Sequence, residues 1–209
     1  MPSREGACEA ARLLASLPSP RRGGHKGFTP AHALMALDLL ERRAGRPSIA
    51  RTLGLGEASA KTLLRSLEEA GLAARSSRGR TLTPGGRRVL EELRAAIRTG
   101  EARPSPFPGE PASYVIVRWV RPPETLIDVY TYRDYAVLSG CRTVMVGAVV
   151  RGATTFPGTP EDAAPSIEAP EEWSGAVLVG PARCERELVD AALLILASSC
   201  GSTGPAWKR

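Results

Sequence analysis

Apolar positions in the first half of the chain recur every three or four residues, the spacing of helices that bury one side. Prolines and glycines interrupt this pattern and mark where each helix starts and stops. The helices it predicts cover residues 6–17, 30–43, 49–53, 57–70 and 84–98. Two short strand candidates, 72–75 and 80–83, lie between the last two helices and flank the basic turn Ser76-Ser77-Arg78-Gly79.

The stretch Gly45–Thr83 contains the parts of a DNA-binding motif in a fixed order. Gly54-Leu55-Gly56 separates two short helices, and its glycines permit a positive φ or a close backbone approach. A two-stranded ribbon with a basic tip follows the second helix. This order is that of a winged helix-turn-helix, whose second helix enters the DNA major groove. We therefore predict a winged-helix DNA-binding domain over residues 1–98.

The second half has denser apolar runs that are rich in β-branched residues, which favours strands. Between the halves, residues 99–112 contain four prolines and two glycines without periodicity, and are predicted to be a linker. Strands are predicted at 114–120, 125–129, 143–150, 153–156 and 176–179, and helices at 131–139 and 184–199. The expected fold class is α+β, with the winged helix-turn-helix domain followed by a small C-terminal α+β domain at 113–209 of about five strands and two helices.

Charge divides the chain in the same way. Residues 1–103 hold 19 basic and 10 acidic residues, a balance of +9, whereas residues 104–209 hold 9 and 12, a balance of −3. A basic half joined to a mildly acidic half indicates a module that binds a polyanion and a second module with another task.

The predicted DNA contacts follow from the two sides of the helix at 57–70. Leu63, Leu64 and Leu67 share its buried side, and the opposite side carries short polar and basic residues. Lys and Arg on a helix in the major groove can pair with guanine edges, while Ser59 and Thr62 can hold phosphates. The ribbon adds further basic residues to this surface. The predicted DNA-binding residues are Ser59, Lys61, Thr62, Arg65, Arg75, Arg78 and Arg80.

The sequence gives no pattern typical of a membrane span, a zinc site or an enzyme active site. No apolar run approaches the ~18 residues that span a bilayer, and the start of the chain lacks a signal-peptide pattern, so a cytoplasmic location is expected. Four widely spaced cysteines and two histidines argue against a zinc site. Both histidines, His25 and His32, lie in the basic half, which leaves the second half without a histidine as general base. We expect neither an enzyme nor a cofactor.

Four short motifs in the second half carry a resemblance. They are Tyr132-Arg133-Asp134-Tyr135-Ala136-Val137, Ser139-Gly140, Gly152-Ala153-Thr154-Thr155 and Pro157-Gly158. With them, the chain resembles archaeal two-domain transcriptional regulators in which a winged helix precedes a C-terminal domain of uncharacterised function. It departs from their pattern at Tyr135, where a small residue is expected, and at Cys141, where alanine is usual. The resemblance implies a regulator and identifies no ligand.

A second candidate site lies within these motifs. Arg133, Asp134, Thr154 and Thr155 are predicted to line an effector pocket for a small anionic metabolite. The alternative is that Arg133 and Asp134 form a structural ion pair that ties helix to sheet, and the sequence leaves both open.

The predicted function is therefore a regulator that binds double-stranded DNA. A homodimer is expected because one module contacts few base pairs and two half-sites raise specificity. The C-terminal domain would serve for dimerisation or for sensing a small-molecule effector. The alternative is a winged-helix module that contacts protein or RNA without sequence-specific DNA binding.

Overall fold

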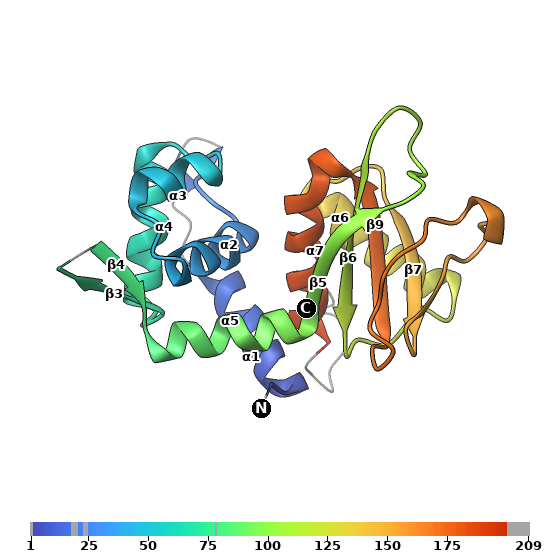
Figure 1. Ribbon diagram of the computed structural model, residues 1–209, viewed down its shortest axis with the longest axis horizontal. Helices are drawn as coiled ribbons and strands as arrows, with labels where there is room; N and C mark the ends of the chain where they lie inside the picture. The colour runs from blue at the N-terminus through green and yellow to red at the C-terminus, as the bar shows by residue number, and fades with distance from the viewer. Residues whose placement is uncertain (1, 18–20, 23–24, 78, 200–209) are drawn as a thin grey trace. The chain divides into compact units, whose positions relative to one another are not determined.

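The computed structural model describes residues 2–17, 21–22, 25–77 and 79–199, and it shows an α+β protein (Figure 1). The chain forms two compact units, Met1–Leu93 and Arg94–Arg209.

The first unit consists of helices and two small antiparallel strand pairs (Figure 1, blue to green). One strand pair joins β1 (Arg21–Arg22) to β2 (His25–Lys26), and the other joins β3 (Ala73–Ser76) to β4 (Gly79–Leu82). The helices are α1 (Arg4–Ser16), α2 (Pro30–Glu41), α3 (Arg46–Thr52), α4 (Glu57–Glu69) and α5 (Pro84–Ala96), whose last residues belong to the second unit.

The core of the first unit is built from the apolar sides that the periodicity predicts. Leu63, Leu64 and Leu67 of α4 are fully buried, together with Leu40 of α2 and Ile49 of α3. This confirms the assignment of the buried side of α4. The start of α3 was predicted too late, at residue 49. Gly45 is its N-cap and Pro47 lies in its first turn, where a proline needs no hydrogen-bonded N–H.

The second unit is a five-stranded antiparallel sheet with two helices, α6 (Leu126–Ser139) and α7 (Glu185–Ser198). The strand order is β5-β6-β9-β7-β8. The strands are β5 (Ile97–Ala102), β6 (Ala112–Arg118), β7 (Met145–Val150), β8 (Ala153–Thr155) and β9 (Gly175–Pro181).

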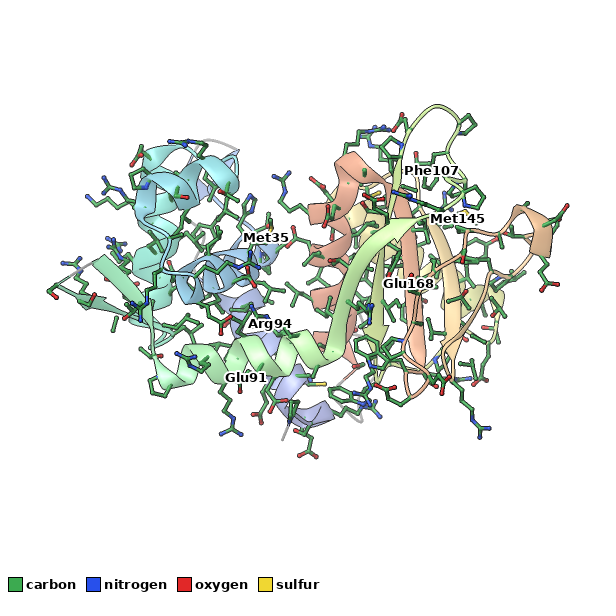
Figure 2. The ribbon with its side chains drawn as sticks, viewed as in Figure 1. Met35, Glu91, Arg94, Phe107, Met145 and Glu168 are labelled. Atoms are coloured by element: carbon green, nitrogen blue, oxygen red, sulfur yellow. The ribbon has the colours of Figure 1, made fainter. Side chains whose placement is uncertain are left out.

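Both faces of this sheet are covered, so β6 and β9 are buried along nearly their whole length. On one face, Tyr114 and Ile116 join a core cluster with Trp173 and other residues of the segment after β8. Phe107 and Met145, labelled in Figure 2, pack against that cluster. Helix α7 packs on β6 and β9 from the other face, to which alternate strand residues point.

The strand predicted at residues 125–129 is wrong, because α6 begins at Leu126. Thr125 is its N-cap: the Thr125 hydroxyl accepts from the N–H of Asp128 at 3.3 Å, and the Asp128 carboxylate accepts from the N–H of Thr125 at 3.1 Å. This reciprocal capping box fixes a helix start. Burial tends to raise the pKa of Asp128, but the hydrogen bonds from Thr125 and Glu124 lower it overall.

The linker predicted at residues 99–112 is also only partly correct, since β5 occupies 97–102 and pairs with β6. Gly100 lies opposite Tyr114 in this pairing, and a Cβ at Gly100 would lie only 2.6 Å from the Tyr114 hydroxyl. The glycine therefore makes room for the aromatic ring of its cross-strand neighbour.

Among the described residues, no helix is both long enough and apolar enough to cross a membrane.

Candidate nucleic-acid interface

Helix α4 presents two basic side chains on its exposed side. Lys61 and Arg65 are one turn apart and both are exposed, opposite the buried leucines. Thr62 is half-buried, and its hydroxyl donates to the carbonyl of Ala58 at 2.9 Å. Ser59 is also half-buried and lies about 160° around the helix from Lys61 at about 100° per residue. The exposed basic stripe of α4 therefore comprises Lys61 and Arg65 with Thr62 at its edge, and Ser59 lies on another side.

The β3–β4 hairpin places two further predicted residues directly opposite each other. Arg75 pairs in register with Arg80, an arrangement in which like charges repel. Glu68 of α4 offsets this repulsion: its carboxylate forms ion pairs with Arg75 at 3.4 Å and, more closely, with Arg80. The Arg80 side chain is only 20% exposed, whereas that of Arg75 is 77% exposed. Arg80 thus fastens the hairpin to α4, and Arg75 projects into solvent.

Replacing Glu68 by alanine is expected to lower the free energy of unfolding by about 1–3 kcal/mol, since it leaves two facing arginines without their acid. Glu69 provides a matched control on the same helix. Its ion pair with Arg65, at 3.3 Å, is exposed, so Glu69→Ala should cost no more than about 0.5 kcal/mol. Urea unfolding of both variants measures the difference. Equal losses would show that Glu68 does not hold the hairpin.

A cleft of about 380 Å³ runs between the hairpin, the α2–α3 connection and α4. Arg43, Arg46 and Arg80 all line this cleft. Arg43 and Arg46 are not among the residues that the sequence predicts to bind DNA. Arg43 is exposed and has a positive φ of 61°, and Arg46 pairs with Glu57 at 3.1 Å. The sequence signal for Arg43 and Arg46 is the clustering of three arginines within Glu41-Arg42-Arg43-Ala44-Gly45-Arg46. Arg78, predicted at the tip of the hairpin, lies outside the described residues.

The predicted effector residues lie on two separate elements of the second unit. Arg133 and Asp134 are exposed on α6, while Thr154 and Thr155 are consecutive residues of β8 and so point to opposite faces of the sheet. Within the described part of the chain, no hydrogen bond or ion pair joins the α6 residues to the β8 residues. Neither Arg133 nor Asp134 takes part in a described ion pair, so the alternative of a structural pair gains no support either. The effector pocket stays a prediction.

The described residues include no cluster of three or more His, Cys, Asp or Glu side chains suited to a metal ion.

Comparison with known proteins gives one structural relative. No family model matches the chain, and no curated protein matches it. Among solved structures, the chain is similar to the hypothetical protein PH0730 from Pyrococcus horikoshii OT3, with a TM-score of 0.57 and 25% sequence identity. The similarity covers 81% of this chain and 91% of that one. The relative is archaeal, as the expected resemblance implied, but its name states no function.

Proposed function

We propose that this protein is a transcriptional regulator that binds double-stranded DNA through a winged helix-turn-helix formed by α3, α4 and the β3–β4 hairpin. The observation that carries the proposal is the exposed pair Lys61 and Arg65 on α4, beside a hairpin from which Arg75 projects. A helix that presents two cations one turn apart, followed by a basic ribbon, suits the major groove and its flanking phosphates.

The basic residues take three different tasks in this proposal. Lys61 and Arg65 enter the major groove, where their donors match the O6 and N7 acceptors of guanine. Arg75 contacts backbone phosphates, which position the module without selecting a sequence. Arg43 and Arg46 extend the cationic surface along the cleft. In the structure, Arg65 forms an exposed ion pair with Glu69. DNA binding would replace this ion pair by a contact between Arg65 and DNA.

The second unit brings two DNA-binding modules together in this proposal. A homodimer would place two copies of α4 on successive half-sites, so that a pseudo-palindromic operator reflects the symmetry of the protein. An effector bound to the second unit would then act through the spacing of the two modules.

Selection of bound fragments from genomic DNA, followed by fluorescence anisotropy on the recovered site, tests the proposal. If each of the two modules of the dimer contacts roughly four phosphates, the affinity of the dimer should fall about 10,000-fold between about 50 and 200 mM salt. Tighter binding to RNA of the same sequence, or the absence of enriched fragments, would contradict DNA regulation and favour an interaction module.

A further inference from the structure

Helix α6 is unusual in having large apolar side chains on its outer surface. Ala136 is its buried residue, and five others project into solvent. Their exposed fractions are 65% for Leu126, 76% for Ile127, 54% for Tyr130, 40% for Val137 and 74% for Leu138. The outer side of a surface helix is normally polar, and an exposed apolar patch marks an interaction site.

These residues form one continuous surface. At about 100° per residue, the five apolar side chains fall within an arc of about 140°, and the same arc contains the exposed Arg133 and Asp134. We call this arc the α6 outer face. The opposite side of the helix packs against α7 and β7. The packing of the second unit therefore leaves the α6 outer face exposed to solvent.

Hydrogen bonds fix the first two turns of α6, the helix that carries this face. The Thr125–Asp128 capping box holds the first turn, and the Tyr132 hydroxyl donates to the carbonyl of Arg121 at 2.6 Å. Burial, with a smaller effect of nearby Asp128, raises the pKa of Tyr132 to about 12, which keeps this hydroxyl a donor. A helix anchored in this way offers a preformed surface for docking.

The order of residues along the outer face makes it complementary to itself. One base and one acid, Arg133 and Asp134, lie at its middle, with apolar residues toward both ends. When two copies run antiparallel about a two-fold axis at this middle, each Arg133 faces the partner's Asp134. Tyr130 of each copy then faces the partner's Val137. An isologous interface requires such a self-complementary patch, whereas a foreign partner would not.

We propose that a second copy of this chain docks on the α6 outer face, so that the two α6 helices pack antiparallel in a homodimer. The apolar ends are buried against each other, and the two central ion pairs fix the register and the antiparallel direction. The inference supplies the dimer surface that the proposed function needs. It does not depend on whether the protein binds DNA.

A charge exchange tests this interface without DNA. The full-length protein at about 50 µM should have the mass of a dimer by light scattering. Arg133→Asp places two acids at the middle of the face, and Asp134→Arg places two bases there, so each variant alone should be largely monomeric. An equimolar mixture of the two variants should recover the dimer, because acids now face bases. The same reversal on β5, Arg98→Asp, should leave the dimer unchanged.

The apolar part of the face has its own variant, Leu138→Glu, which should also give a monomer with an unchanged circular dichroism spectrum. A monomeric wild-type protein, or charge variants that remain dimeric alone, would overturn the interface. Recovery of the dimer in the mixture cannot arise from misfolding of either variant. If the dimer forms as expected but no DNA is bound, the proposed function fails and this interface stands.

Discussion

Replacing Gly86 by alanine is expected to lower the free energy of unfolding by about 3 kcal/mol or more. Gly86 lies in the first turn of α5, and a Cβ there would lie 2.0 Å from the carbonyl oxygen of Leu72 and 2.9 Å from its carbonyl carbon. Both are backbone atoms and cannot rotate away. The same carbonyl accepts from the N–H of Thr83 at 3.1 Å, so any shift of α5 also disturbs the closure of the β3–β4 hairpin.

The neighbouring glycine is the control for this prediction. A Cβ at Gly85 meets its nearest atoms at 3.5 and 3.6 Å, which is ordinary contact. Because alanine favours a helix over glycine by up to about 1 kcal/mol, Gly85→Ala should leave stability unchanged or raise it. Urea unfolding monitored by circular dichroism compares the two variants. Similar midpoints for both would show that α5 does not pack this closely against Leu72.

Local periodicity was sufficient to predict most of the first unit. The spacing of Leu63, Leu64 and Leu67 predicts a helix and also its buried side, since both follow from the geometry of the helix itself. The hairpin after it was predicted within one residue at each strand, because Gly79 and Pro84 are local signals that stop and start backbone structure.

The errors in the second unit have two different physical causes. The start of α6 has a local signal that the apolar pattern does not contain: Thr125-Leu126-Ile127-Asp128 has the spacing of a capping box. The local sequence does not predict strand β5, because the cause of this strand is not local. Its sequence, IRTGEA, lacks an apolar alternation, and it is a strand only because β6 supplies hydrogen bonds and Tyr114 covers Gly100.

Some features of the candidate site follow from local spacing, and others depend on contacts between residues far apart in the sequence. The exposure of Lys61 and Arg65 follows from helical spacing within α4 and could be predicted. The role of Arg80 could not, because its partner Glu68 lies 12 residues earlier and meets it only when the hairpin folds back on α4. Long-range contacts of this kind decide which basic residues stay available to a ligand.

Removing both exposed cations of α4, as Lys61→Ala with Arg65→Ala, is expected to weaken binding to the selected DNA site about 100-fold. Each good contact between such a side chain and a base edge contributes about 1–3 kcal/mol of discrimination. Because these contacts depend on the base, the loss should be larger on the selected site than on unrelated DNA. Fluorescence anisotropy on both DNAs measures the ratio. Both residues are exposed and Arg65 holds only the exposed Glu69, so stability should change little.

Two single variants separate the roles of the basic residues. Arg75→Ala should weaken binding by a similar factor on every DNA and reduce the salt dependence, since a phosphate contact carries no sequence information. Arg88→Ala, an exposed change on α5, should leave binding to the selected site nearly unchanged. If the α4 double variant lost affinity equally on selected and unrelated DNA, α4 would contact only the backbone. The major-groove placement of Lys61 and Arg65 would then be wrong, even for a protein that binds DNA.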